Sequence, residues 1–146
     1  MAALEKGRKA VDAAIDQLVA DDEQLKARFD LITSVLGIGV ATATEVIIAS
    51  NDLTTITDPK KMACRAGFAP FAYKSGTSVR SRPGVSQHAR KRLKSLFHLA
   101  AMAAIRVKGE IQDYYQHKVK ERKNKMLVRN AVRNKLIHQL LIRTIY

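Results

Sequence analysis

The residue in this sequence best suited to covalent chemistry is Ser75, which is followed by a glycine. It lies among three cations: Lys74, Arg80 and Arg82. A serine hydroxyl can attack phosphorus when a base accepts its proton and cations stabilise the oxyanion that forms. Prolines and glycines punctuate residues 68–84, so this stretch cannot be one continuous helix. It indicates phosphate chemistry or phosphate binding, and the alternative is a Ser-Gly turn in a loop that contacts DNA.

A second basic cluster follows at the start of a helix that we predict from residue 87 to about residue 107. Its members are Arg90, Lys91, Arg92 and Lys94. Cations at a helix N-terminus oppose the helix dipole, a cost that makes sense if an external anion sits there. Just before them lies His88, a candidate base for the serine. We therefore assign these residues to nucleic-acid binding, with a merely solvated face as the alternative.

We expect no metal site within this sequence. The four histidines are scattered, without metal-ligand spacing to Cys64 or to a carboxylate. Residues 59–146 contain only three acids: Glu110, Asp113 and Glu121. Two acids on one helix face chelate Mg²⁺ poorly. Metalloprotease, Walker-type and dinucleotide-binding motifs are missing as well. Metal-dependent nuclease chemistry is therefore not predicted within these residues.

The net charge of +13 is divided unevenly along the sequence. Residues 1–58 hold 10 acids and 5 bases, whereas residues 59–146 hold 3 acids and 21 bases. Charge of one sign destabilises a folded surface unless a polyanion neutralises it, and nucleic acid is the obvious polyanion. An anionic membrane surface is the rival, but it usually requires exposed aromatic anchors. The charge therefore indicates nucleic acid as the class of partner, without indicating an activity.

Neither secretion nor membrane insertion is predicted. The only cysteine, Cys64, excludes an internal disulfide and fits a reducing cytoplasm. The longest apolar run, 96–105, contains a histidine and is too short to span a bilayer. We expect a cytoplasmic protein.

A heptad pattern dominates the first 32 residues. Its apolar members are Leu4, Val11, Leu18, Leu25 and Ile32. Five consecutive matches predict one long amphipathic helix that packs as a coiled coil. The partner helix could be a second copy, giving a homo-oligomer, or another part of the same chain.

Two glycines, Gly37 and Gly39, interrupt the helical pattern over residues 35–43. Helix, Gly-x-Gly turn and helix match the helix-hairpin-helix motif, in which backbone N–H groups at the second helix face a DNA phosphate. A simple turn between helices is the alternative.

The remaining sequence predicts further helices and hence an all-α fold. Thr57-Asp58-Pro59 indicates a capped helix to about Arg65, and other helices span about 110–120 and 126–146. The last helix is amphipathic: we expect Leu127, Ala131, Leu136, Leu140 and Leu141 to point inward and Arg129, Arg133 and Lys135 to point outward. A short hairpin across 71–79, or an irregular Ser-Gly loop, is the only departure. We divide the chain into a coiled-coil helix, 1–32, and a helical domain, 33–146.

Several ordered motifs together resemble one known family. They are Leu36-Gly-Ile-Gly39, Ala63-Cys-Arg-Ala-Gly-Phe-Ala-Pro70, Lys74-Ser-Gly-Thr-Ser78, Arg90-Lys-Arg-Leu93 and Ala131-Val-Arg-Asn-Lys-Leu136. From about residue 31 onward the chain resembles the C-terminal transposase domain of the IS110/IS116/IS902 family of bacterial insertion sequences. The preceding heptads resemble the coiled-coil region of that family.

The resemblance implies a DNA recombinase in which Ser75 is the catalytic nucleophile and forms a phosphoserine intermediate. It implies multimers in which a bridge RNA selects the DNA, and a RuvC-like domain whose acids bind Mg²⁺. That domain is absent from this sequence, which we interpret as a fragment that binds DNA without cutting it alone. Leu36 also stands where the family often has proline. The alternatives are a non-catalytic helix-hairpin-helix module and a coiled-coil interaction protein whose charge serves solubility.

Overall fold

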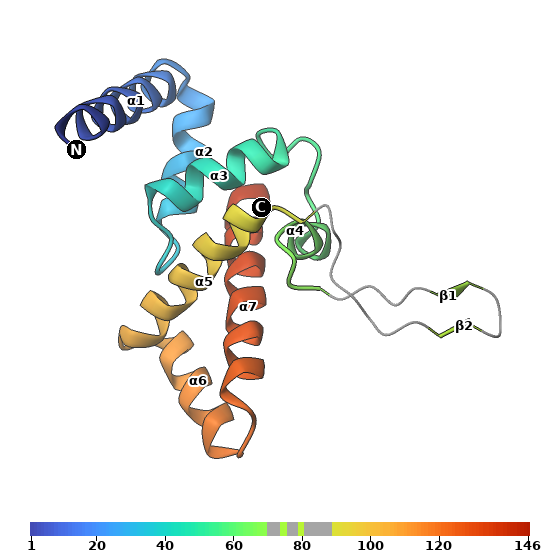
Figure 1. Ribbon diagram of the computed structural model, residues 1–146. Coiled ribbons are helices and arrows are strands. Elements are labelled where there is room, and N and C mark those ends of the chain that lie inside the picture. The colour runs from blue at the N-terminus through green and yellow to red at the C-terminus, as the bar shows by residue number, and fades with distance from the viewer. Residues whose placement is uncertain (70–73, 76–78, 81–88) are drawn as a thin grey trace.

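The computed structural model describes residues 1–69, 74–75, 79–80 and 89–146. These residues form seven helices and one pair of very short strands (Figure 1). In chain order the elements are α1 (Ala2–Asp21), α2 (Glu23–Thr33), α3 (Val40–Ser50), α4 (Pro59–Arg65), β1 (Lys74–Ser75), β2 (Val79–Arg80), α5 (Lys91–Arg106), α6 (Glu110–Lys120) and α7 (Lys125–Ile145). The predicted all-α class is confirmed.

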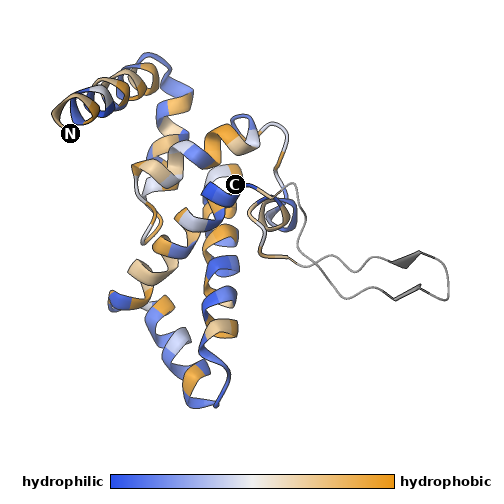
Figure 2. Cartoon of the chain, viewed as in Figure 1, coloured by the Kyte–Doolittle hydropathy of each residue, from blue (hydrophilic) through white to orange (hydrophobic). Residues whose placement is uncertain are grey.

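Helix α7 lies at the centre of the fold, where it packs against α2, α4, α5 and α6. Hydrophobic and hydrophilic residues alternate along it (Figure 2), and the buried ones recur at helical spacing, so one face enters the core. Of its predicted inward residues, Leu136, Leu140 and Leu141 are buried. The prediction for Leu127 is wrong, because this side chain is 70% exposed and Val128 takes the inward position.

The helix predicted over residues 3–32 is broken in two at Asp22. This residue has an extended backbone, and its carboxylate accepts hydrogen bonds from the backbone N–H groups of Gln24 and Leu25. An aspartate in this position caps the next helix, because it satisfies N–H groups that have no partner within the first turn. The prediction of one continuous helix is therefore wrong, because the heptad pattern continues across the residue at which α1 ends.

The break divides the heptad residues into two environments. Leu4, Val11 and Leu18 on α1 are 78%, 59% and 66% exposed, and α1 has no buried residue. Ile32 on α2 is fully buried, and α2 packs against α3 and α7. Figure 1 shows α1 extending away from the other helices, with the N-terminus at its far end. Intramolecular packing therefore accounts for α2 and leaves the apolar stripe of α1 uncovered.

Helix α4 begins as predicted. Asp58 is its N-cap and accepts a hydrogen bond from the backbone N–H of Lys60, and Pro59 occupies the first turn. Gly67 follows the helix with a φ of +74°, which places Phe68 in the core at 4% exposure. The chain thus enters the stretch that contains Ser75 from a fixed, buried anchor.

Helix α5 begins at Lys91, later than the predicted residue 87. Arg90 has an extended backbone and donates its N–H to the carbonyl oxygen of Arg65, the last residue of α4. This hydrogen bond ties the end of α4 to the start of α5. It therefore brings together the two ends of the segment that carries the serine.

No described helix is both long enough and apolar enough to cross a membrane.

Candidate nucleic-acid interface

The predicted serine lies in a two-residue strand of an antiparallel pair. β1 and β2 align Lys74 with Arg80, and Ser75 with Val79, which agrees with the hairpin predicted from the sequence. The pairing places two of the predicted cations opposite each other along the backbone. Arg82 and His88, the other two candidates in this stretch, lie outside the described residues.

The four cations at the start of α5 are held in two different ways. Lys91 and Lys94 are exposed, and the described residues offer neither of them a carboxylate partner. Arg90 and Arg92 instead share Glu45 of α3: Arg90 Nη1 lies 3.0 Å from Oε1, and Arg92 Nε lies 3.5 Å from Oε2. The anion that we expected from outside at this helix start is therefore supplied in part by the chain itself.

Glu45 is a residue of this interface that the sequence analysis did not single out. Its side chain is only 11% exposed, so two guanidinium groups offset the cost of burying its charge. A single acid in the otherwise uncharged helix Val40–Ser50 is the signal that could have found it. Its partners lie 45 residues away or more, which no local pattern reveals.

The two predicted hairpin glycines have different environments. Gly37 has a φ of +85°, and a Cβ added to it would lie 2.4 Å from the carbonyl oxygen of Ala100 and 3.2 Å from the Cβ of Ala104. Gly39 is the N-cap of α3 with a φ of −99°, and a Cβ there would meet nothing within 4 Å. Gly37 therefore serves the close approach of the hairpin to α5.

The N-terminus of α3 lies next to Gly39 and lacks a capping side chain. The first N–H groups of a helix have no intrahelical partner, and the helix dipole makes this end attractive to anions. Val40 and Ala41, the first two residues of α3, are exposed, whereas Thr42 is buried. The geometry is compatible with the phosphate contact predicted for the hairpin.

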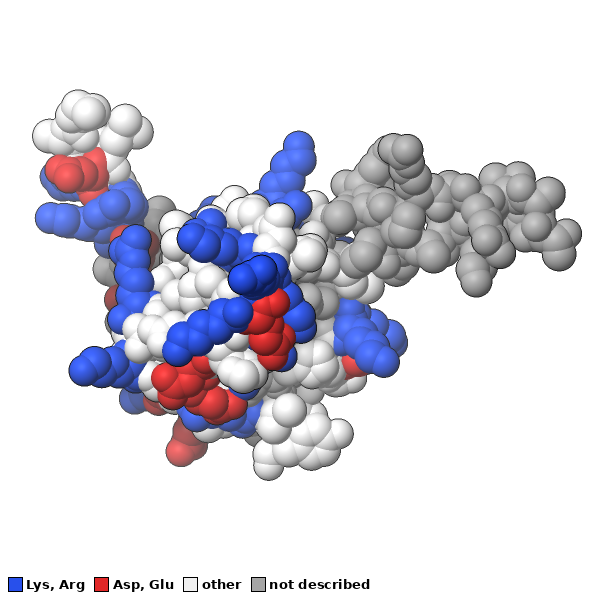
Figure 3. Space-filling model, turned by 90° about the horizontal axis from the view of Figure 1, so that it is seen from below, with Lys and Arg blue, Asp and Glu red and all other residues white. Residues whose placement is uncertain are grey.

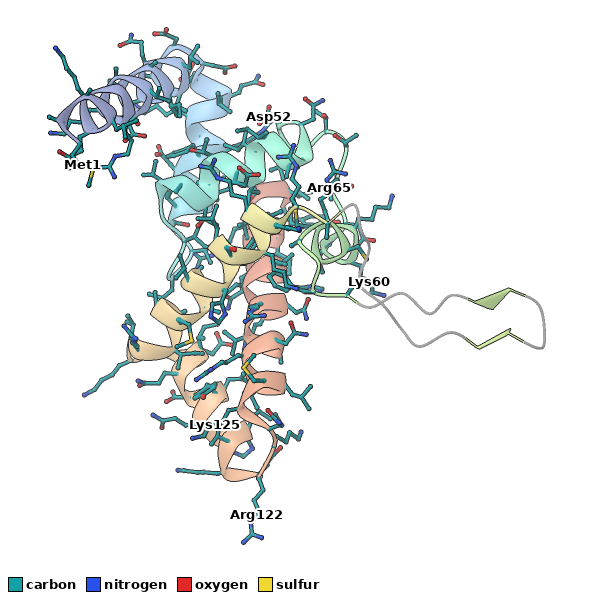
Figure 4. The ribbon with its side chains drawn as sticks, viewed as in Figure 1. Met1, Asp52, Lys60, Arg65, Arg122 and Lys125 are labelled. Carbon is teal, nitrogen blue, oxygen red and sulfur yellow. The ribbon has the colours of Figure 1, made fainter. Side chains whose placement is uncertain are left out.

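Positive charge is spread over the helical body as well. On the face seen in Figure 3, Lys and Arg side chains are numerous and Asp and Glu side chains lie among them. Figure 4 places Lys60 and Arg65 on α4, on the side of the body from which β1 and β2 extend. Both residues are exposed. The cations that remain open near the serine segment are thus carried by α4 and by the start of α5.

Metal ligands do not gather in the part of the chain that the structure describes. Within it, no group of three or more His, Cys, Asp or Glu side chains is placed to hold a metal ion. A Mg²⁺ ion therefore does not fit the described residues.

Comparison with known proteins identifies similar sequences. The family model described as "Transposase IS116/IS110/IS902 family" matches residues 29–116, which is more than half of the chain. The matched range includes the glycine hairpin, Ser75 and the start of α5.

Several curated proteins are similar over most of this chain. A pilin gene-inverting protein of Moraxella bovis is 27% identical over 128 residues, which cover 87% of this chain and 40% of that protein. An insertion element IS116 uncharacterized 44.8 kDa protein of Streptomyces clavuligerus is 31% identical over 114 residues, 72% of this chain and 28% of that protein. An insertion element IS110 uncharacterized 43.6 kDa protein of Streptomyces coelicolor is 27% identical over 115 residues, 79% of this chain and 27% of that protein. The chain thus spans less than half of the length of each relative.

Proposed function

The chain belongs to the transposase IS116/IS110/IS902 family, and we propose that it supplies the serine nucleophile and a DNA-binding surface of an insertion-sequence transposase. The observation that carries the proposal is the family match over residues 29–116, which includes Ser75 together with the cations on both sides of it. The name of the Moraxella bovis relative records the inversion of a gene, which is a rearrangement of DNA. The proposed reaction is accordingly DNA strand exchange.

In the proposed step, the Ser75 hydroxyl attacks a phosphodiester of the DNA backbone. The bond from Oγ to phosphorus forms, and the bond from phosphorus to one deoxyribose oxygen breaks. The hydroxyl proton passes to a base, for which His88 is the candidate, and the released deoxyribose oxygen takes up a proton. Lys74, Arg80 and Arg82 stabilise the negative charge that builds up on the phosphate oxygens. A second deoxyribose oxygen then attacks the phosphoserine and restores the serine.

The proposed DNA surface includes the start of α5, which follows the serine segment, and the N-terminus of α3, whose preceding turn lies beside Ala100 and Ala104 of α5. Lys91 and Lys94 contact backbone phosphates directly, and the first N–H groups of α3 bind another phosphate. Arg90 and Arg92 contribute less than their number suggests, because Glu45 already neutralises part of their charge. In this proposal the contacts at the start of α5 hold the DNA next to the end of the serine segment.

In this proposal, other parts of the reaction are supplied by a further domain and by an RNA. The family resemblance implies a RuvC-like domain whose acids bind Mg²⁺ and a bridge RNA that selects donor and target DNA. The described residues gather no metal ligands, so we assign this chain binding and the nucleophile, and expect it to leave DNA uncut when it is alone. A non-catalytic helix-hairpin-helix module remains the second candidate, because it needs the cations and the hairpin but not Ser75.

The exposed stripe of α1 suits self-association. Leu4, Val11 and Leu18 repeat every seven residues and remain open to solvent, as in a helix whose coiled-coil partner is a second copy. We propose that α1 pairs with α1 of another chain, so that two serine segments act in one complex.

Leu18→Glu is expected to convert a dimer into a monomer, because it places a charge in the centre of the paired stripe. Ala13→Glu adds the same charge on the opposite side of α1 and should leave the dimer intact. Sedimentation velocity of both variants measures the change. The thermal unfolding midpoint should not move in either case, since α1 has no buried residue. A Leu18→Glu protein that remains dimeric contradicts the pairing.

Binding to DNA tests the proposal most directly. We expect the chain to bind a 30-base-pair duplex with an affinity that falls steeply with salt, with a log–log slope of about −4 if about four phosphates are neutralised. Fluorescence anisotropy at several salt concentrations measures this slope. A flat plot would favour the third interpretation, a coiled-coil interaction protein whose charge serves solubility.

A serine–DNA adduct trapped on a suicide substrate in the whole transposase would distinguish a nucleophilic Ser75 from the non-catalytic module.

A further inference from the structure

Two basic side chains, Arg133 of α7 and His98 of α5, are in contact, and the charge of a third, Arg129, acts on both. Arg129 and Arg133 lie one turn apart on α7, and His98 lies on α5. All three are half-buried. Phe68, the buried residue that precedes the serine segment, forms one side of the cluster, because the guanidinium carbon of Arg133 is 5.3 Å from the centre of its ring.

Arg133 is partly buried, yet no anion among the described residues pairs with it. One terminal nitrogen contacts Nδ1 of His98, the guanidinium lies over the Phe68 ring, and the buried Nε has no hydrogen-bond partner. Burial, and then the charge of Arg129, lower the pKa of Arg133. Among the described residues, no carboxylate pairs with Arg129 or Arg133. This cluster therefore contains positive charge that nothing in the described fold neutralises.

The contact with Arg133 also defines the state of His98. A guanidinium can only donate hydrogen bonds, so Nδ1 of His98 must accept and Nε2 must carry the hydrogen of the neutral ring. Burial, Arg133 and Arg129 all lower the pKa of His98, which keeps this neutral form at pH 7. The three side chains thus offer only N–H donors to an approaching group.

We propose that the cluster of His98, Arg129 and Arg133 binds a backbone phosphate of the DNA. A phosphate supplies the acceptor oxygens and the negative charge that the cluster lacks, and partial burial strengthens the attraction relative to an exposed lysine. The inference rests on the proposed function, to which it adds a contact on α7 that the predicted interface did not contain. Because Phe68 is part of the cluster, the phosphate bound there lies beside the entrance to the serine segment.

Arg129→Gln tests this site with little risk to the fold, because the main hydrogen bond of Arg129 in the described structure is a long one to the sulfur of Met126, at 3.7 Å. Its matched control is Lys123→Gln, which removes the same charge from a lysine already paired with Glu121 at 3.0 Å. Lys123 lies in the turn between Arg122 and Lys125, which Figure 4 shows at the N-terminal end of α7. Thermal unfolding of each variant verifies that it folds.

The readout is anisotropy with the 30-base-pair duplex across several salt concentrations. We expect Arg129→Gln to weaken binding about 5- to 10-fold and to make the log–log slope shallower by about 1, the signature of one lost phosphate contact. Lys123→Gln should change affinity less than twofold. Equal effects of the two variants, with steep binding by the unaltered chain, would overturn the phosphate site and leave the proposed function standing. No salt-dependent binding by the unaltered chain would instead overturn the proposed function itself.

Discussion

Ser75→Ala is expected to abolish strand exchange by the whole transposase while leaving its affinity for DNA unchanged within about threefold. The alanine has no oxygen to form the bond with phosphorus, so the covalent intermediate cannot form. Removing the nucleophile of a serine enzyme lowers turnover on the order of 10⁶-fold. DNA binding persists because the change removes no charge and no phosphate contact. An in vitro recombination assay and an anisotropy titration of the same preparation measure the two effects.

Ser78→Ala is the matched control for this experiment, because it removes a hydroxyl from the same segment. It should retain recombination within a few-fold and still form the covalent adduct on a suicide substrate. If Ser75→Ala recombines at the normal rate, the nucleophile assignment is wrong and the non-catalytic module is the better interpretation. If both variants lose DNA binding, the segment acts by holding DNA and not through one hydroxyl.

Gly37→Ala should destabilise the fold by about 3 kcal/mol, the largest effect that we expect from adding one methyl group. About 1 kcal/mol comes from forcing a residue with a Cβ into a left-handed backbone conformation. A further 1–3 kcal/mol comes from the clash with the carbonyl oxygen of Ala100, which pushes the hairpin away from α5. Urea unfolding followed by circular dichroism measures the loss, and the thermal midpoint should fall by about 6–12 °C.

Gly39→Ala separates this packing effect from the general cost of replacing a glycine. Its φ is negative and the space around it is open, so the expected cost is about 1 kcal/mol or less, from the poorer N-cap. Equal destabilisation by the two variants would show that the contact between Gly37 and α5 does not hold the hairpin in place. The proposed phosphate contact at the N-terminus of α3 depends on that placement.

Features that depend on neighbouring residues were readable from the sequence. Asp58 and Pro59 predict the start of α4 correctly, because an N-cap and a first-turn proline both act within one turn of the helix. The turn at Gly37 between α2 and α3 also follows from local residue types, and the strand pair at Ser75 agrees with one of the two alternatives that those types offered. The start of α5 was predicted too early, because no local pattern shows that the backbone N–H of Arg90 donates to the carbonyl oxygen of Arg65 and that Arg90 is extended.

Features that depend on distant residues could not be read in this way. The pairing of Glu45 with Arg90 and Arg92 joins α3 to α5 and exists only once the chain has folded. Arg133 was expected to point outward because it is charged. No local pattern shows that its guanidinium lies over the ring of Phe68. Asp22 was overlooked for the opposite reason: a regular heptad pattern outweighed a short-range capping signal. For the candidate site, residue types could be predicted, but which charges are already neutralised could not.

The central position of α7 has a consequence for synthesis of the protein. It is the last of the described helices to leave the ribosome, yet α2, α4, α5 and α6 all pack against it. Until residues 125–145 emerge, the apolar faces of those helices have no common partner. The earlier helices can pack against one another, as α3 does with α5 and α5 with α6. We expect the faces that contact α7 to stay exposed until that helix is made, so that the core closes late in synthesis.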